Sequence, residues 1–454
     1  MPERTCVLGR TMDFFGFLGP VKSISYVSAP LLRPTKIEMG TQYALSAWFR
    51  YLNIAGVRVD GNLTRIDLHE LLLNTTLNSQ EVVRSAFGGE NYFVVWEDNK
   101  KGNQSELGRR ESGIYLTRVT PRGEILDIPP ICIKDELNIR EFYPDIAFAS
   151  QKFIVTYAIP AQQLSYDIKG AIVDQEGNIL QYIDIDNTGP DAVRVYPSTG
   201  ASPTHFLCAY QLSGPGLTHF IRVALMPEEE PSNIQRYTIE WVEAPPLSPP
   251  DVASDGTKFI VVYQWLDAIR GAIVIPEMGP SLPFLIGGGI DPAVIFGDRY
   301  YFVTWISPTV DPHIVMGRFI HPDGIPAGPP FVIYESPNLI RRLSIKFDGW
   351  EYLISFKDLE DGKIKTVAVS LDGSLLGEVP WIISDEHPAQ RNASLSKGPG
   401  NQILATYEGL VPDPLYSVSN KIQQQDSVLD PYRAFARFLE FFEVEEFAVA
   451  YNSN

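Results

Sequence analysis

The sequence predicts an all-β protein assembled from about eight copies of one four-stranded antiparallel unit. Two observations lead to this prediction. A short apolar strand that ends in an aromatic side chain recurs along the 454 residues, and turn residues recur at nearly constant distances from it. The repeat length is about fifty residues. Length alone would suggest about three domains, but one ring of repeats can absorb a chain of this size.

The recurring strand is apolar at nearly every position. Such a strand must be covered on both faces, so the units are expected to stack face to face. The aromatic side chains that end it are then packing positions between units, an interpretation we favour over sugar stacking because the position recurs in every unit. These aromatics are Trp48, Trp96, Tyr157, Tyr210, Tyr263, Trp305, Phe356 and Tyr407.

Three further strands surround the aromatic one in each unit. A Gly usually precedes the aromatic by seven or eight positions, with Ser150 in its place in the third unit, and an earlier strand lies before it. A third strand such as Ile168–Val173 follows, then a polar turn such as Glu176-Gly177, then a fourth strand. Gly at such turns is typical of hairpins, so each unit reads as an antiparallel meander.

Stacked in a closed ring, such units would leave only short, protected edges. The pattern resembles the β-propeller superfamily over nearly the whole chain. The paired signatures of WD40 repeats and the sialidase box are absent, and the kelch Gly-Gly occurs once, at Gly88-Gly89. The strand Val94-Val95-Trp96 is similar to loosely defined bacterial and archaeal surface-protein repeats. That resemblance implies a binding or structural module, although fold does not determine function.

We expect one propeller of eight blades, with seven as the alternative. Residues 1–33 form an arm that closes the ring, with residues 20–30 pairing with the last unit. The propeller occupies residues 34–454, with a strand favoured over a helix near 431–442. The expected blades are 34–72, 82–133, 143–186, 194–239, 249–286, 291–333, 340–383 and 391–454, the last interrupted by an insertion at 409–433.

Charge and composition limit the partners. The formal charge of −18 disfavours nucleic acid and anionic membrane surfaces as partners, and solubility is the favoured explanation of the charge. A protein partner is expected because the chain carries strong packing repeats without a catalytic motif. No apolar stretch is long enough to span a membrane, and no signal peptide is visible. We favour an extracellular or cell-surface location, with the cytoplasm as the alternative. Cys132 and Cys208 lie in apolar runs and are expected to be buried free thiols.

Candidate chemistry is confined to polar residues that should lie at one mouth of the central channel. They are Asp98, Asp267, Asp311, His313, Asp358 and Glu408. Paired carboxylates could act as acid and base on a glycan, but solvated loop charges are the favoured interpretation in so acidic a chain. No catalytic, metal-ligand or cofactor motif is present, and no cofactor is expected. The sequence therefore favours a non-enzymatic interaction or structural module, with a polysaccharide-active hydrolase or lyase as the alternative.

Overall fold

The computed structural model describes the protein over most of the repeats. The described residues are 4–6, 8–9, 11–13, 22–23, 32–39, 44–50, 53–59, 66–67, 71–73, 79–99, 112–135, 142–161, 165–187, 192–214, 218–242, 248–307, 313–347, 349–359, 364–382, 391–397, 403–411 and 433–440. All regular structure in this part of the chain is β-strand. Within these ranges there is accordingly no helix that could cross a bilayer.

Four-stranded antiparallel sheets follow one another along the chain. The first two contain β5 (Leu32–Met39), β6 (Ala44–Arg50), β7 (Asn53–Val59) and β8 (Leu71–Leu72), then β9 (Ser79–Gly88), β10 (Asn91–Asn99), β11 (Ser112–Val119) and β12 (Ile131–Asp135). Next come β13 (Phe142–Ala149), β14 (Lys152–Pro160), β15 (Tyr166–Asp174) and β16 (Ile179–Asp186), followed by β17 (Val193–Ala201), β18 (His205–Gly214), β19 (Thr218–Pro227) and β20 (Gln235–Val242). A single parallel bridge, Tyr166 to Val193, links these last two meanders.

The remaining sheets repeat the same order. One contains β21 (Asp251–Ser254), β22 (Phe259–Trp265), β23 (Ala268–Ile275), β24 (Gly279–Pro280) and β25 (Phe284–Gly288). Two more contain β26 (Ile290–Gly297), β27 (Tyr300–Ile306), β28 (His313–Ile320) and β29 (Phe331–Ser336), then β30 (Ile340–Phe347), β31 (Glu351–Asp358), β32 (Ile364–Ser370) and β33 (Leu375–Ile382). The last meander is β34 (Arg391–Lys397), β35 (Ile403–Val411) and β36 (Arg433–Glu440), so the chain has a strand rather than a helix near 431–442.

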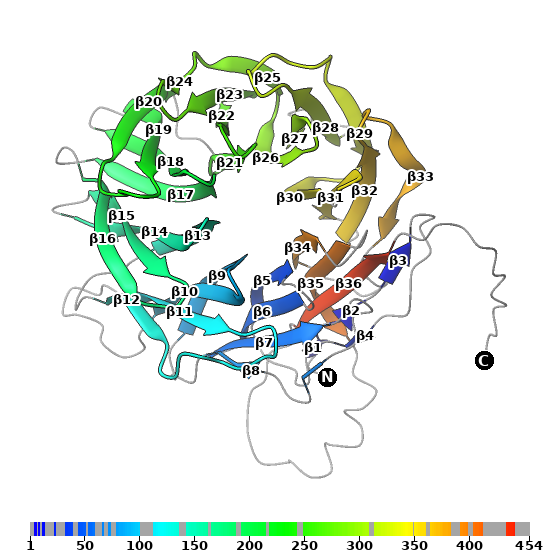
Figure 1. Cartoon of the computed structure of the whole chain (residues 1–454). Coiled ribbons are helices and arrows are strands. Elements are labelled where there is room, and N and C mark those ends of the chain that lie inside the picture. Colours follow the sequence, from blue (N-terminus) through cyan, green and yellow to red (C-terminus); the bar gives the residue numbers. More distant parts are fainter. Residues whose placement is uncertain are drawn as a thin grey trace, which may run out of the picture.

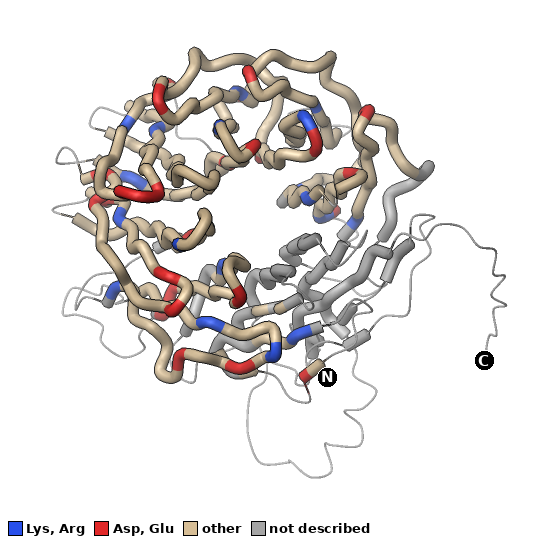
Figure 2. Tube along the Cα trace, in the orientation of Figure 1, with Lys and Arg blue, Asp and Glu red and all other residues tan. Residues whose placement is uncertain are grey.

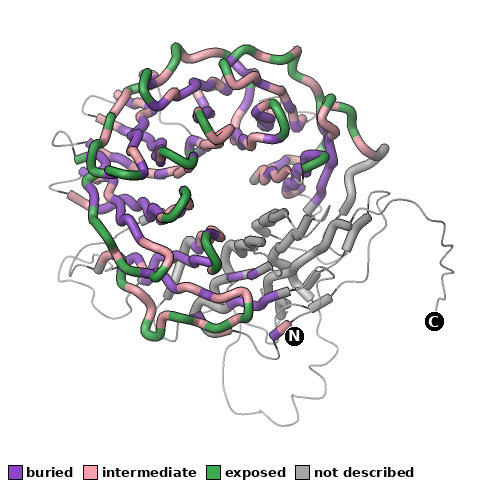
Figure 3. Tube along the Cα trace, in the orientation of Figure 1, coloured by how far each residue is buried: buried purple, intermediate pink, exposed green. Residues whose placement is uncertain are grey.

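The sheets are arranged in a ring (Figure 1). The first strand of each sheet lies nearest the centre, and the last strand lies on the outer circumference. Strand β5 of the first sheet contacts β34 of the last, which brings the two ends of the repeat series together. This architecture is a β-propeller. Buried residues follow the middle of the sheets, and exposed residues lie on the circumference and at hairpins nearer the centre (Figure 3).

The N-terminal residues join the last sheet. Strand β1 (Arg4–Cys6) pairs antiparallel with the end of β35, and β3 (Thr11–Asp13) pairs in parallel with β36. Strand β4 (Lys22–Ser23), the described part of residues 20–30, instead pairs with β2 (Leu8–Gly9). The ladder with the last sheet is thus made by residues earlier in the chain than the segment expected from the sequence.

The aromatics of the second strands lie between neighbouring sheets. Trp96, Tyr157, Tyr210, Tyr263, Trp305 and Phe356 are all buried, each in an apolar cluster that also contains residues of the preceding sheet. The side chains of Trp48 and Tyr407 lie outside the described part of the structure. These buried rings are therefore packing positions, because apolar groups from two sheets surround each of them.

Trp305 also explains the run of three glycines, residues 287–289, that precedes its own sheet. Its indole nitrogen donates a hydrogen bond to the Gly288 carbonyl at 2.7 Å. A Cβ on Gly287 or Gly289 would lie 2.2 Å from atoms of the ring. The glycines allow the backbone to approach the indole this closely.

Carboxylates on the innermost strands link neighbouring sheets. Asp145 Oδ2 accepts a hydrogen bond from the backbone nitrogen of Thr199 at 2.8 Å, and Asp251 Oδ2 accepts one from Val294 at 2.9 Å. In both cases the nitrogen lies beside a β-bulge in the next sheet, where the ladder register shifts. The bulge disrupts regular pairing, and the carboxylate of the neighbouring sheet provides an acceptor for the nearby backbone group.

Replacing Trp305 by Ala should destabilise the fold by about 3–5 kcal/mol, because it removes a buried side chain and leaves a cavity between two sheets. Trp350→Ala is the matched control, since Trp350 is 67% exposed and its loss should cost less than about 0.5 kcal/mol. Urea unfolding of both variants gives the comparison. Equal midpoints for the two would show that the second-strand aromatics do not hold the sheets together.

Deleting residues 1–13 should lower the melting temperature and promote self-association, because it removes β1 and β3 and leaves β35 and β36 with unpaired edges. Thermal melting and size-exclusion chromatography measure the two effects. Unchanged melting and a single monodisperse peak would contradict a closing role for these strands.

Candidate functional site

The polar residues expected at the channel mouth differ in their surroundings: some are buried on strands and one is exposed in a turn. Asp98 on β10 and Asp358 on β31 are buried. Asp358 Oδ2 accepts hydrogen bonds from Lys365 Nζ at 2.7 Å and Asn338 Nδ2 at 3.0 Å, so this carboxylate ties the connection between β29 and β30 to strand β32. Asp267 is exposed in the turn between β22 and β23. Its carbonyl oxygen accepts the Gly289 N–H at 2.7 Å.

The remaining expected residues are His313, Asp311 and Glu408. His313 is the first residue of β28 and pairs in register with Ser336. Asp311 and the side chain of Glu408 lie outside the described residues. Among the side chains that are described, no group of three or more His, Cys, Asp or Glu could hold a metal ion. Cys208 is buried as expected, but Cys132 is exposed, because its position on the outermost strand β12 leaves that side chain uncovered.

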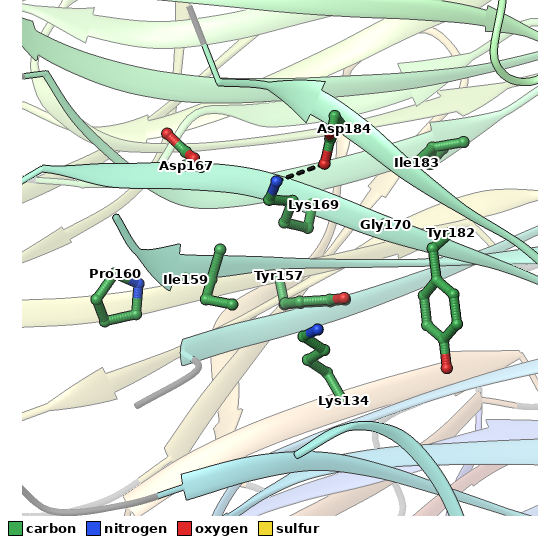
Figure 4. Close-up of a pocket in the computed structure, with 10 residues that line it drawn as sticks. All are labelled: Lys134, Tyr157, Ile159, Pro160, Asp167, Lys169, Gly170, Tyr182, Ile183 and Asp184. Atoms are coloured by element: carbon green, nitrogen blue, oxygen red, sulfur yellow. Dashed lines mark hydrogen bonds and ion pairs between the residues drawn. The ribbon is translucent and has the colours of Figure 1, made fainter. Parts of the chain in front are cut away.

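A pocket lies between the sheet of β9–β12 and the face of β14–β16 (Figure 4). We call it the inter-sheet pocket. Its volume is about 280 Å³. It is lined by Lys134, Tyr157, Ile159, Pro160, Asp167, Lys169, Gly170, Tyr182, Ile183 and Asp184. None of these was singled out as a site residue from the sequence, where Tyr157 was assigned only to packing.

Strand register gathers Tyr157 and the polar side chains of β15 and β16 on one face. Lys169 lies opposite Tyr157 on one side and opposite Asp184 on the other. Residues directly opposite each other share a face, as do residues two apart in one strand, so Asp167 and Tyr182 belong to the same face. Lys134 reaches the pocket from β12 of the preceding sheet (Figure 4).

The rim of the pocket is charged. Lys169 Nζ forms an ion pair with Asp184 Oδ1 (Figure 4). Asp167 Oδ1 lies 3.3 Å from an Arg194 guanidinium nitrogen. Burial raises the pKa of Asp167, and the nearby charges of Lys169 and Arg194 oppose that rise. Burial likewise raises the pKa of Tyr182. Its hydroxyl, which is protonated at neutral pH in any case, can donate a hydrogen bond.

A buried ionic network supports the pocket from behind. The carboxylate of Asp186, the last residue of β16, accepts hydrogen bonds from Tyr210 at 2.6 Å and from Arg222 at 2.8 Å. Arg194 Nε lies 3.2 Å from the same oxygen. Burial, reinforced by the Asp186 charge, holds the pKa of Tyr210 well above its usual value, so this hydroxyl is a permanent donor. Through Arg194, the network fixes both Asp186 and the pocket residue Asp167.

The pattern that marks the pocket is present in the sequence. Asp167 and Lys169 alternate with the buried Ile168, and Tyr182 and Asp184 alternate with Ile183. Polar side chains at alternate positions on two adjacent strands indicate a face that is not fully covered by apolar packing. What cannot be read locally is which element faces them, because Lys134 belongs to another repeat.

No known protein family matches the sequence, and no curated protein matches it. Solved structures do show a likeness. A prolyl endopeptidase matches at 12% identity and a TM-score of 0.44, over 75% of this chain and 47% of the peptidase. The β-propeller domain of the trilobed protease from Pyrococcus furiosus matches at 10% identity and a TM-score of 0.42, over 78% of this chain and all of that domain.

An α-L-arabinanase from Penicillium chrysogenum, solved with arabinobiose, matches at 12% identity and a TM-score of 0.42, over 67% of this chain and 94% of the enzyme. This chain thus spans about half of the prolyl endopeptidase and nearly all of the arabinanase. At these identities the likeness concerns the fold alone, and it assigns no activity to this chain.

Asp186→Asn should destabilise the protein by about 3–5 kcal/mol, because Arg194 and Arg222 would both lose a buried counter-charge. Asp184→Asn is the matched control, since Asp184 is exposed and its ion pair should contribute less than about 1 kcal/mol. Denaturant unfolding measures both. A loss below 1 kcal/mol for Asp186→Asn would show that the network does not stabilise the fold.

Proposed function

We propose that this chain is a non-enzymatic, eight-bladed β-propeller that binds a protein partner through its outer rim. The first strands of eight successive meanders support this blade number over seven: β5, β9, β13, β17, β21, β26, β30 and β34. A surface or extracellular assembly is the proposed setting, and it rests on the sequence resemblance to surface-protein repeats.

The observation that carries the proposal is the exposure of large apolar side chains on the outermost strands and the turns beside them. Their strongest concentration is a short stretch that we call the rim segment, residues 278–285. Within it Met278 is 79% exposed, Leu282 is 88% exposed and Leu285 is 59% exposed. Clustered exposed apolar groups, unlike scattered ones, are typical of a surface that binds another protein.

The charge of the chain supports a partner of particular chemistry. Acidic side chains occur all around the described part of the ring (Figure 2), and the whole chain carries a formal charge of −18. A partner that places an apolar patch on the rim segment, surrounded by Lys or Arg, would match both properties. Its association should be steered by charge and should slow at high salt.

A photocrosslinking residue at Leu282 in the full-length chain should capture one partner in the native cells, and the same residue at Ile128 should not. Ile128 is a matched control because it is 76% exposed on a different part of the rim. With the purified partner, the double variant Met278→Asp, Leu282→Asp should weaken binding tenfold or more, because two apolar anchors are lost.

Two results would overturn the proposal. One is unchanged affinity in the double variant while Ile128→Asp weakens binding. The other is turnover of a polysaccharide by the purified chain, abolished by Asp98→Asn or Asp358→Asn in a folded protein, which would instead establish the enzymatic alternative.

A further inference from the structure

The inter-sheet pocket has features of a ligand site that are independent of the rim segment. It lies between the sheets of β9–β12 and β13–β16, whereas the rim segment belongs to the sheet of β21–β25. We propose that the pocket binds a single saccharide ring, as a neutral pyranose unit of a glycan. This inference does not rest on the proposed protein partner.

The size of the pocket limits the ligand. Its volume of about 280 Å³ lies just below the range of about 300–1,000 Å³ that is typical of ligand sites. The space therefore suits one sugar ring better than a nucleotide or an extended peptide. Tyr157 and Ile159 are nearly fully buried and close the pocket on the side of β14, so a ligand must enter from the solvent side where Asp184 and Tyr182 are exposed.

The polar groups of the pocket match the chemistry of sugar hydroxyls. A hydroxyl both donates and accepts hydrogen bonds, so a ring with several hydroxyls needs donors and acceptors together. The carboxylates of Asp167 and Asp184 supply acceptors. The ammonium groups of Lys134 and Lys169 and the hydroxyl of Tyr182 supply donors. The groups come from two sheets, so they approach a bound ring from more than one side (Figure 4).

The charge of the pocket argues against a strongly anionic ligand. Two lysines and two aspartates line it, so their formal charges cancel. Lys169 is paired with Asp184, and Asp167 is paired with Arg194. A phosphate would have to break the first of these pairs or lie beside two carboxylates. A neutral polyhydroxylated ring can use both charged pairs without disturbing either.

Tyr182 supplies the apolar surface that sugar binding also needs. It projects from the outermost strand β16 and is 56% exposed. The face of an aromatic ring carries partial negative charge, which favours contact with the C–H groups on one face of a pyranose. In its exposure Tyr182 differs from the six second-strand aromatics whose side chains are described, all of which are buried. Tyr182 is therefore accessible to a ligand at the edge of the pocket, whereas those buried rings are not.

The test uses the full chain and methyl pyranosides of glucose, galactose, mannose and N-acetylglucosamine as probes in saturation-transfer NMR. At least one should bind saturably with a Kd on the order of 1 mM, as expected for so small a ligand. Tyr182→Ala should weaken that binding tenfold or more. Trp350→Ala, which removes an exposed aromatic from another sheet, should leave it unchanged.

Asp184→Asn is a second test of the saccharide site. Because Asp184 is exposed, the variant should fold normally, which thermal melting can check. It should weaken binding severalfold, because a neutral amide replaces a charged acceptor. The proposal is overturned if no pyranoside binds saturably, if Tyr182→Ala retains full affinity, or if inorganic phosphate competes for the pocket and the pyranosides do not. None of these outcomes would affect the proposed role of the rim segment.

Discussion

The faces of neighbouring sheets bury one another, and the rest of the structure depends on that contact. In β10, successive residues Val94 and Val95 are both fully buried although their side chains point to opposite faces. One belongs to the cluster shared with the preceding sheet and the other to the cluster shared with the next. A sheet with two apolar faces needs a neighbour on each side, and a closed ring supplies one at every position. The N-terminal strands pair with β35 and β36 and so add strands to the last sheet of this ring.

Polar groups also link neighbouring sheets. Arg118 forms a two-pronged pair with Asp127 of its own sheet and donates to the Gln175 carbonyl in a turn of the next sheet at 3.1 Å. Arg58 makes the same arrangement one sheet earlier, with the Pro121 carbonyl at 2.7 Å. The glycine of the turn, Gly177, lies so close to the Arg118 guanidinium that a Cβ would approach it to 2.7 Å. Glycine at this turn therefore serves the contact between sheets as well as the positive φ of the turn.

The inter-sheet pocket lies where this apolar coverage ends. Strand β12 spans only Ile131–Asp135, whereas β14 and β15 of the next sheet each span nine residues. At the pocket, that face carries the charged side chains of Asp167, Lys169 and Asp184 in place of aliphatic ones. The buried network around Asp186 holds the same face against the following sheet. The pocket thus combines a charged rim with a wall that a buried ionic network ties to the following sheet.

Periodicity in the sequence was enough to predict an all-β chain of repeated four-stranded meanders, because the continuous apolar strand and the turn glycines are local patterns that recur in each repeat. Burial of aromatics such as Trp96 and Trp305 followed from the same recurrence. The turns were predicted less completely: at the hairpin of Gly297 it is Asp298 that adopts the positive φ of 53°. A local pattern specifies that a turn occurs but leaves open which of its residues takes the unusual conformation.

Only the tertiary structure decided which polar residues meet. Asp358 reads as a solvated loop carboxylate in the sequence, yet it is buried against Lys365, because the fold brings a neighbouring strand over it. Lys134 and Tyr182 are 48 positions apart, in different repeats, and share a pocket. The repeated pattern in the sequence predicts only the features that all the sheets share. The pocket is lined by side chains that are particular to two sheets, and contacts between such side chains depend on how the ring is assembled.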